Sequence, residues 1–506
     1  MSGYLIGIDA GTTNIKAVLF RTDGKQLAEA SGKNEVLTPR AAWAEQNMNA
    51  LWERTAACCR SLMEKTGVEK TDILAVGLSA QGEGLWTIGT DGNPMRNAIL
   101  WNDGRAAELV AELKKDARLI EDIKLRVGSY IKPGSTLVQI KWLAENEPEV
   151  YAGVRAIFTC KDYLRYRMTG SIRWERTDAS CSCLDMDTRE YPADIFERLG
   201  IASALEKLPV LMESTDCGGT LTPAAADAMG LLPGTPVSGG VIDIVATAVG
   251  AGAVDTYSVC TILGTTGMNL MTVERYEPDL EFNGWECHML RGNYVKGMGM
   301  MAAMPNQDWV LREIFGQQEI TAEVFAETDP IMLSMAPGEG GLLYLPHIDP
   351  SGERAPFFDP TACAQIMGIK TSTTKYEILH AVIEGVCLGI RSCLEILPEG
   401  HPVFLSGGGA KSAVWPQILA DCTGREVLIC ESTELAAKGA ALSAAMMAGV
   451  YKTCEEANGF FRIKRSVRPD AERKRRYDAL YAIYHSAQEQ AKEYWRMRSA
   501  YVKEEK

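Results

Sequence analysis

One structural unit occurs near the start of each half of this 506-residue chain: an apolar run, a turn rich in Gly and Thr, and a second apolar run. In the first copy the runs are Tyr4 to Asp9 and Ile15 to Phe20. In the second copy they are Tyr257 to Leu263 and Met268 to Thr272, on either side of Gly264 to Gly267. Short apolar runs bounded by turn residues are typical of buried strands. A repeat spaced by about half the chain predicts two similar α/β domains that face each other, and not a short-period solenoid.

The remaining apolar patterns add elements that suit two α/β domains. The expected strands are Gln26 to Ser31, Ile73 to Leu78, Pro236 to Ile242 and Pro402 to Leu405, and the expected helices are Asn47 to Lys65, a small-residue helix from Asp243, Ser412 to Cys422 and a charged segment from Pro469. Gly and Ala cluster at Gly250 to Gly252. We therefore place the domain boundary there, with residues 1–250 in the first domain and 251–506 in the second.

Composition limits the class of protein and its partners. The chain carries 52 basic and 66 acidic residues, a formal net charge of −14, which argues against nucleic acid or an anionic membrane as the main partner. No stretch reaches about 18 uninterrupted apolar residues, and the first residues lack the pattern of a signal peptide. The 14 cysteines show neither zinc-ligand nor disulfide spacing. These features predict a soluble protein of a reducing compartment, which we place in the cytoplasm.

The two Gly/Thr turns are candidates for binding phosphate. Glycine lets phosphate oxygens approach the backbone closely, and threonine hydroxyls donate further hydrogen bonds. A carboxylate at the end of the preceding strand can hold Mg²⁺. The residues concerned are Asp9, Gly11, Thr12, Thr13 and Lys16 in the first turn, and Gly264, Thr265 and Thr266 in the second. A polar hairpin turn is the alternative for each, but two such turns at matching places would clamp a triphosphate from both sides.

A run of three glycines precedes another expected helix. Gly407, Gly408 and Gly409 follow an expected strand, and Ser412 opens the helix. The spacing matches neither a P-loop nor a dinucleotide fingerprint. Consecutive glycines let a flat base or a ribose lie against the backbone, and an ordinary strand-to-helix turn is the alternative.

Asp243 and two polar segments are candidates for the chemistry and for a polyol substrate. Asp243 opens a helix, so spacing alone favours an N-cap, while the functional alternative is a general base for a substrate hydroxyl. The polar segments contribute Gln81, Gly82 and Glu83 from one loop, and Trp101 and Asp103 from another. Amide and carboxylate groups bind hydroxyls, and an indole face accepts the C–H side of a sugar. Ordinary polar loops are the alternative.

Taken together, these residues resemble the FGGY family of carbohydrate kinases, and the similarity runs over nearly the whole chain. It is most specific at Ala364-Gln-Ile-Met-Gly368-Ile and at Glu377-Ile-Leu-His-Ala381-Val-Ile-Glu384-Gly385, which are similar to the family's C-terminal signature. Thr177 to Ser180 and Ser351 to Arg354 are similar to further family segments. The resemblance implies an α/β fold of two ribonuclease H-like domains, of the actin and hexokinase type, with a cleft between them.

The resemblance also implies roles for the candidate residues. It implies that ATP and Mg²⁺ bind at the two turns, with Asp9 at the metal, and that the adenosine lies at Gly408, Gly409 and Ser412. It makes Asp243 the base that deprotonates the sugar hydroxyl, so that the N-cap becomes the minor interpretation. The implied sugar site comprises Gln81, Gly82, Glu83, Trp101, Asp103 and Asp243.

The loop after Gln81 favours some substrates over others. In D-xylulose kinases the glutamine is usually followed by Met-His, and glycerol kinases carry Arg-Glu there, whereas Gly82 and Glu83 follow here. Gln-Gly-x-Gly-Leu is more similar to L-xylulose kinases and also to erythritol kinases. The expected substrate is a ketopentose, L-xylulose before D-xylulose, with erythritol or another polyol as the alternative. A non-catalytic sugar-binding regulator on the same fold is a second alternative. The sequence leaves the oligomeric state open, and a homodimer is the first candidate because dimers are the commonest homo-oligomers.

Overall fold

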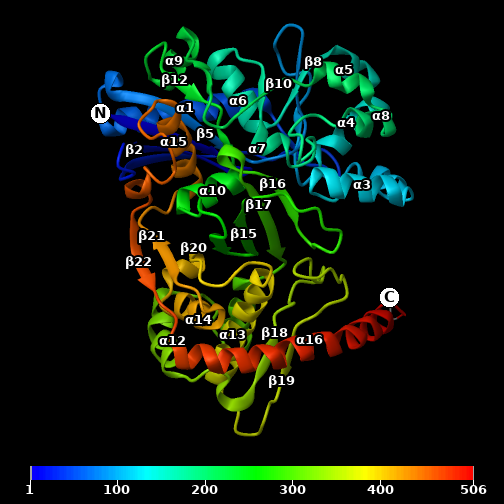
Figure 1. Ribbon diagram of the computed structural model, residues 1–506, viewed down its shortest axis with the longest axis vertical. Helices are drawn as coiled ribbons and strands as arrows, with labels where there is room; N and C mark the ends of the chain where they lie inside the picture. Colours follow the sequence, from blue (N-terminus) through cyan, green and yellow to red (C-terminus); the bar gives the residue numbers. More distant parts are fainter. Residues whose placement is uncertain (1–2, 505–506) are drawn as a thin grey trace.

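The computed structural model describes residues 3–504 and consists of two α/β halves, each built around a seven-stranded mixed sheet (Figure 1). The first sheet has the order β11-β12-β5-β1-β2-β3, and β13 pairs with the end of β5. β1, β2 and β3 are successive antiparallel strands, and β5 and β12 continue the sheet in parallel with β1. The strands are β1 (Tyr4–Ala10), β2 (Asn14–Arg21), β3 (Gln26–Lys33), β5 (Ile73–Ala80), β11 (Cys217–Thr220), β12 (Pro236–Ser238) and β13 (Val241–Ile242).

The second sheet repeats this topology in the order β16-β17-β15-β14-β20-β21-β22. β14, β15 and β17 are antiparallel, and β20 and β21 continue in parallel with β14. The strands are β14 (Val259–Leu263), β15 (Gly267–Val273), β16 (Trp285–His288), β17 (Tyr294–Met300), β20 (Val403–Gly407), β21 (Val427–Cys430) and β22 (Ile463–Val467). Three antiparallel strands followed by parallel ones in both halves confirm the predicted class of two ribonuclease H-like domains.

Helices cover the outer face of each sheet. α1 (Met48–Thr66) begins after Asn47, whose side chain accepts a hydrogen bond from the Ala50 amide, and ends at Gly67 in the left-handed conformation. α1 covers β2 and β3, and α9 (Pro223–Met229) packs beside α1. On the second sheet the corresponding layer consists of α13 (Lys375–Leu394) and α14 (Val414–Thr423), with the long C-terminal helix α16 (Ala471–Glu504) packed across them (Figure 1).

The two inner helices are exchanged between the halves. α10 (Asp243–Ala251) ends the first half of the chain but packs against β14 and β20, whereas α15 (Leu435–Met447), from the second half, packs against β1 and β5. Glycines allow this close contact. A Cβ on Gly7 would lie 1.8 Å from the Ala437 carbonyl oxygen, and one on Gly77 would lie 1.8 Å from that of Ala440. The two helices also pack tightly on each other and share one apolar core between the sheets.

Insertions add smaller elements to each half. Between β5 and β11 the chain forms a lobe with its own apolar core. The additional elements of the first half are β4 (Glu45–Gln46), β6 (Trp86–Gly89), β7 (Ala98–Ile99), α2 (Ala107–Leu113), α3 (Ala117–Val127), α4 (Thr136–Asn146), α5 (Pro148–Gly153), β8 (Val154–Phe158), α6 (Cys160–Thr169), β9 (Arg173–Glu175), α7 (Arg176–Ala179), α8 (Ala193–Arg198) and β10 (Val210–Met212). Those of the second half are α11 (Met304–Trp309), α12 (Ala322–Ser334), β18 (Leu343–Leu345) and β19 (Gln365–Met367).

The predicted strands and helices are confirmed, with local corrections. The single strand predicted over Pro236 to Ile242 is wrong, because Gly239 and Gly240 divide it into β12 and β13. The helix expected from Ser412 begins at Val414, after a 3₁₀ turn over Gly408–Lys411. The proposed boundary at Gly250 to Gly252 falls at the end of α10 and stays a prediction. Within the described residues, none of the helices combines the length and the apolar composition that crossing a bilayer requires.

Candidate active site

Two aspartates from different elements come together at the C-terminal ends of β1, β5 and β13. Asp9 lies near the end of β1, and Asp243 is the first residue of α10. Both β1 and β13 pair with Ser79 of β5, at Asp9 and Val241 respectively. The interruption at Gly240 makes this possible. Its φ is 86°, and a Cβ there would lie 2.8 Å from the Leu78 carbonyl oxygen, so glycine lets β13 rejoin the sheet and deliver Asp243 beside Asp9.

The electrostatics of this pair favour proton binding near neutral pH. Burial raises the pKa of Asp243 to about 8, the charge of Asp9 adds to the shift, and a hydrogen bond from the Ile244 amide opposes it. That bond is 2.7 Å long, so Asp243 also stabilises the first turn of α10. Burial raises the pKa of Asp9 to about 6, and the neighbouring Ser79 hydroxyl and the charge of Lys16 oppose this shift. A carboxylate with a raised pKa beside a second carboxylate is typical of a catalytic acid or base.

The surroundings of Asp9 fit a hard cation. Its Oδ1 atom is buried and has no hydrogen-bond partner among the described residues. Leaving a carboxylate oxygen buried and unpaired is costly, and a bound metal ion removes that cost. Within residues 3–504, no three His, Cys, Asp or Glu side chains form a group that could hold a metal ion by themselves. The site therefore suits an ion such as Mg²⁺, which keeps water and phosphate oxygens as ligands.

Thr12 connects the first turn to the loop after β5. Its hydroxyl donates to Oε1 of Gln81 at 2.9 Å and accepts from the indole Nε1 of Trp101 at 3.1 Å. Gln81 donates to Oε1 of Gln46 at 2.8 Å and is almost fully buried. Trp101 is 44% exposed, which leaves ring surface available to a ligand. The structure thus brings predicted phosphate and sugar residues into one network, with Gly11 and Thr13 on either side of Thr12.

The segment Gly82–Glu83 bends sharply at the side of this network. Glu83 adopts a left-handed conformation with φ 55°, and its amide donates to Oδ1 of Asp178 at 3.2 Å. Its carboxylate lies 2.6 Å from Nζ of Lys132, and this pairing raises the pKa of Lys132. A Cβ on Gly82 would lie 2.1 Å from Cδ1 of Ile242, so a larger residue would have to move the side chain of the residue that precedes Asp243. The loop is therefore packed directly against the start of α10.

Asp103 differs from the other predicted sugar residues. Its side chain is 0% exposed, and its carboxylate accepts hydrogen bonds from Nε of Arg105 at 2.9 Å and from the Ala44 amide at 2.6 Å. Arg105 in turn lies over the ring of Trp43, with 3.7 Å from Cζ to the ring centroid. Asp103 is thus enclosed and shapes the loop that carries Trp101, and its direct contact with a substrate stays a prediction.

Lys16 is already paired with a residue of the other half. Its Nζ lies 2.6 Å from Oε2 of Glu434, which stands at the start of α15. The prediction that Lys16 meets a phosphate therefore needs qualification, since a phosphate would have to compete with this carboxylate. The ion pair does place Lys16 close enough to Asp9 to lower the pKa of that aspartate.

The second Gly/Thr turn is held by backbone hydrogen bonds, and its Thr265 is more exposed than Thr12 in the first. Gly264 accepts a hydrogen bond from the Met304 amide and donates to the Thr266 carbonyl, and the Thr265 carbonyl accepts from the Ala303 amide. The Thr265 residue is exposed, and a Cβ on Gly264 would meet no atom within 4 Å. The turn therefore leaves space beside the Gly264 backbone and exposes Thr265 to solvent.

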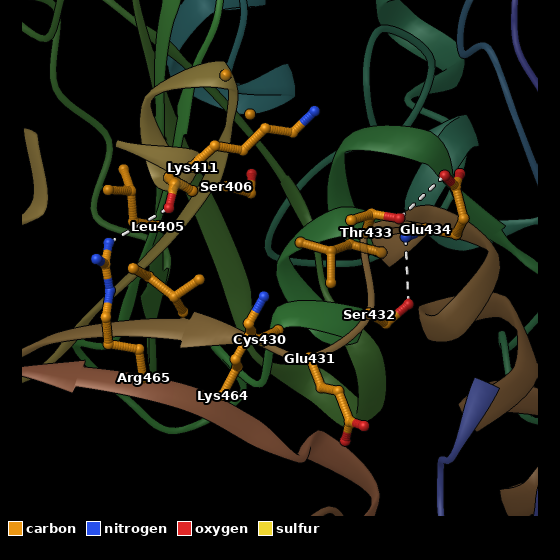
Figure 2. A pocket seen from close by; sticks show the side chains of 15 residues that line it. Leu405, Ser406, Lys411, Cys430, Glu431, Ser432, Thr433, Glu434, Lys464 and Arg465 are labelled. Carbon is orange, nitrogen blue, oxygen red and sulfur yellow. Dashed lines mark hydrogen bonds between the residues drawn. The ribbon is translucent and has the colours of Figure 1, made fainter. Parts of the chain in front are cut away.

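A cavity of about 570 Å³ lies at the ends of β20, β21 and β22 (Figure 2). Lys411 and Lys464 reach into this region from one side, and Thr433 and Glu434 line the other (Figure 2). Among the predicted adenosine residues, Gly408 lines the cavity. Gly409 is buried beneath it, where a Cβ would lie 2.2 Å from Cδ2 of Leu263, and the Ser412 hydroxyl donates to Asp329 at 3.3 Å. The volume is within the range of small-molecule sites.

Sequence reasoning missed several residues of this region. Gln46 and Lys132 stand on segments without any sequence signal for binding, and only the fold brings them to Gln81 and Glu83. Asp178 lay within a family-like segment, but no role followed from its position. Its contact with the Glu83 amide could not be derived without the fold.

Two sheets of the same topology, paired aspartates and two Gly/Thr turns define the class of two-domain phosphotransferases built like actin and hexokinase. Comparison with known proteins makes the assignment specific. Residues 4–250 match the model of the N-terminal domain of the FGGY family of carbohydrate kinases, and residues 259–448 match that of its C-terminal domain. The chain belongs to the FGGY family of carbohydrate kinases. It is an ATP-dependent phosphotransferase whose acceptor is an alcohol group of a carbohydrate.

Relatives and solved structures agree over nearly the full length. The chain is 32% identical to a xylulose kinase of Bacillus subtilis strain 168, covering 95% of this chain and 96% of that protein. It is 30% identical to the L-xylulose/3-keto-L-gulonate kinase of Escherichia coli strain K12, covering 96% of each. The crystal structure of a xylulose kinase from Rhodospirillum rubrum has the same fold, with a TM-score of 0.87 at 24% identity over 97% of this chain and all of that one.

Proposed function

We propose that the protein transfers the γ-phosphoryl group of MgATP to a hydroxyl group of a ketopentose, with L-xylulose the first candidate and D-xylulose the second. The single observation that carries the proposal is the position of Asp243, a carboxylate with a raised pKa between Asp9 and the sugar loop. The sequence Gln81 to Leu85 supports the L-xylulose branch, and the names of the two relatives support a xylulose substrate.

In the proposed mechanism Asp243 orients the attacking hydroxyl and accepts its proton. Only the deprotonated form can accept this proton, and with a pKa raised to about 8 that form is a stronger base than an ordinary aspartate. Trp101 would support the apolar face of the sugar and Glu83 would bind its hydroxyls. Gln81 would bind a hydroxyl by exchanging one of its present hydrogen bonds, to Thr12 or to Gln46, for one to the sugar. In this proposal Asp103 does not touch the sugar, because its own oxygens are enclosed. It contributes by holding Arg105.

The phosphates would lie between the two turns. The backbone amides and hydroxyls at Gly11, Thr12 and Thr13 would bind them from the first half, and those at Gly264, Thr265 and Thr266 from the second. Asp9 would hold Mg²⁺, which when bound neutralises charge on the transferred phosphoryl group. Gly408, Gly409 and Ser412 would support the adenosine, with Gly408 at the cavity of Figure 2.

We also propose a cytoplasmic location, where ATP is available, and a homodimeric assembly. No two cysteines form a disulfide within residues 3–504, which suits a reducing compartment. The alternative substrate is erythritol or a related polyol, favoured by the Gln-Gly-x-Gly-Leu pattern of the sugar loop.

A coupled ADP-release assay over ketopentoses, tetritols and hexonates tests the proposed substrate. Turnover is expected to be highest with L-xylulose or D-xylulose, and a clear preference for erythritol would replace the ketopentose with the alternative. If none of the tested sugars and polyols is phosphorylated, the result would favour the non-catalytic regulator.

The same assay tests the proposed base. We expect Asp243→Asn to lower kcat by about 10³-fold or more, because proton transfer and correct orientation are both lost, while ATP still binds. Asp255→Asn, an exposed position on the following loop, is the matched control and is expected to keep full activity. Near-normal turnover by Asp243→Asn would remove Asp243 from the role of base.

A further inference from the structure

A cluster of fully buried charges lies behind the proposed sugar site. Nζ of Lys161 lies 2.6 Å from Oδ2 of Asp162, 3.1 Å from Oε2 of Glu175 and 3.4 Å from Oδ2 of Asp178. All four side chains are 0% exposed, and Asp162 is also held by Arg165 at 2.6 Å. Burial alone would lower the pKa of Lys161, but the three carboxylates hold it above its ordinary value. One ammonium group therefore serves as the common partner of three acids.

The first branch of this cluster reaches the sugar loop. Oδ1 of Asp178 accepts the amide hydrogen of Glu83, and Oδ2 accepts the Thr159 hydroxyl at 2.7 Å. Glu83 has φ 55°, a conformation that costs a non-glycine residue about 1 kcal/mol or more unless its surroundings hold it. The hydrogen bond from its amide to a buried carboxylate supplies that restraint. The carboxylate of Glu83 is thereby directed to Lys132 at the edge of the site.

The second branch reaches the proposed base. Oε2 of Glu175 accepts the Thr177 hydroxyl at 2.7 Å, and the same hydroxyl accepts the amide hydrogen of Ile242 at 3.0 Å. Ile242 is the residue immediately before Asp243. The other oxygen of Glu175 accepts the Thr177 amide at 2.9 Å and the Ser214 hydroxyl at 2.6 Å, so the carboxylate is fully engaged. Lys161 thus reaches the peptide that starts α10 through its ion pair with Glu175 and two hydrogen bonds.

Stability alone gives a poor account of this arrangement. Removing several charges from water is costly, and well-packed apolar residues of similar volume often replace buried ion pairs without loss of stability. The two branches, in contrast, end at the two segments that must be held relative to each other for phosphoryl transfer. A displacement of about 1 Å between a substrate hydroxyl and its base can lower the rate by about 100-fold.

We propose that Lys161, Glu175 and Asp178 are positioning residues that set the sugar loop and the base relative to each other, Asp178 through the Glu83 amide and Glu175 through Thr177 and the Ile242 amide. The inference rests on the proposed function, because it takes Glu83 as part of the sugar site and Asp243 as the base. It assigns separate kinetic consequences to the two branches, which a purely structural cluster would not produce.

Two near-isosteric substitutions separate the branches. Asp178→Asn retains the shape but cannot accept hydrogen bonds from both the Glu83 amide and the donors on its other side, so we expect the KM for the sugar to rise about tenfold with little change in the KM for ATP. Thr177→Val removes the hydroxyl between Glu175 and Ile242, so we expect kcat to fall about tenfold with a smaller change in the sugar KM. Thr177→Ser restores the hydroxyl and is expected to restore kcat.

The controls repeat the same chemical changes at buried positions away from the site. Thr55→Val removes a hydroxyl that bonds only within α1, and Asp421→Asn alters a buried carboxylate that accepts from Arg473 on α16. Both are expected to affect thermal stability without separating kcat from KM. If Asp178→Asn and Thr177→Val behave like these controls, or if Thr177→Ser fails to restore kcat, the positioning role is wrong.

Two further measurements keep the proposal testable under other outcomes. If Asp178→Asn does not fold, Thr159→Val weakens the same branch while leaving the Asp178 carboxylate in place, although it also removes the contacts of this hydroxyl with Asp162 and Trp174. We expect the sugar KM to rise about threefold, and an unchanged KM would overturn that branch. If the unaltered protein phosphorylates none of the tested sugars, the proposed function fails, and hydrogen exchange then tests the geometry. The Glu83 amide should exchange faster in Asp178→Asn and the Ile242 amide faster in Thr177→Val. Unchanged exchange at both amides would refute the inference.

Discussion

The two Gly/Thr turns each join two antiparallel strands of a sheet but differ in what surrounds them. In the first, Thr12 is held by Gln81 and Trp101, and Asp9 lies two residues before Gly11. In the second, Thr265 is exposed, and the residue two before Gly264 is Ile262, which carries no charge. The comparison shows that a duplicated unit has kept its turn while only the first copy carries a carboxylate. We infer that the first turn joins metal, phosphate and sugar, and that the second serves the nucleotide.

The largest effect is expected from removing the carboxylate of Asp9, which has no counterpart beside the second turn. Asp9→Asn deletes the carboxylate whose Oδ1 is buried without a partner, and we expect kcat to fall by about 10²- to 10³-fold. Titration with Mg²⁺ in the coupled assay should show a large increase in the metal concentration needed for half-maximal rate. Ile262→Val at the matching position of the second half is the control and should leave the Mg²⁺ dependence unchanged.

Equivalent threonines in the two turns should give different kinetic results. Thr265→Val is expected to raise the KM for ATP about tenfold and to leave the KM for the sugar unchanged, since one phosphate contact is lost. Thr12→Val should raise both KM values, because Thr12 also holds Gln81 and Trp101. Equal effects of the two variants on both substrates would mean that the turns have the same role.

The juxtaposition of Asp9 and Asp243 should also make stability depend on pH. The pKa of Asp243 is raised to about 8 in the folded protein from an ordinary value of 3.8, so this group favours folding at low pH and loses that contribution as the pH rises towards 8. Asp243→Asn should therefore increase Tm by about 1–3 °C at pH 8 and by less at pH 5, measured in EDTA. Thr265→Val should show the same Tm difference at both pH values, as no carboxylate is involved.

The smallest effect is expected from the ion pair that connects the first hairpin to α15. Lys16 and Glu434 are partly exposed, with side-chain exposures of 37% and 12%, so Glu434→Gln should change stability by only about 0–1 kcal/mol. Releasing Lys16 should lower the KM for ATP up to about threefold if Lys16 can then reach a phosphate. An unchanged or higher KM would show that Lys16 serves only the contact between the halves.

Local patterns in the sequence were sufficient to predict the repeated strand–turn–strand unit and the main helices. The turn residues and Asp243 could be named because glycine, threonine and aspartate carry their chemistry wherever the backbone places them. The enclosure of Asp103 by Arg105 and the pairing of Lys16 with Glu434 could not be predicted, since each depends on a partner brought there by the tertiary fold. The same holds for the cluster around Lys161, whose branches end at residues far away in the sequence.

The break in the strand before Asp243 shows a second limit of sequence reasoning. Pro236 to Ile242 has the composition of one continuous strand, and periodicity does not show that Gly239 and Gly240 leave the sheet and return to it. The divided strand nevertheless determines where Asp243 lies. Glycines within an apolar run can mark such an interruption, but only the neighbouring Leu78 carbonyl shows why it occurs at this position.

The exchange of α10 and α15 has a consequence for how the chain is made. When residues 1–250 have left the ribosome, β1 and β5 lack the helix that covers them, because α15 ends at Met447. At about 5–20 residues per second, the ribosome needs a further 10–40 s or so to supply it. The first half must remain incompletely folded during that time, with an apolar sheet face open to chaperones or to misassembly. The protein is therefore expected to complete its folding as one unit, late in synthesis, and a fragment cut near Gly252 should aggregate.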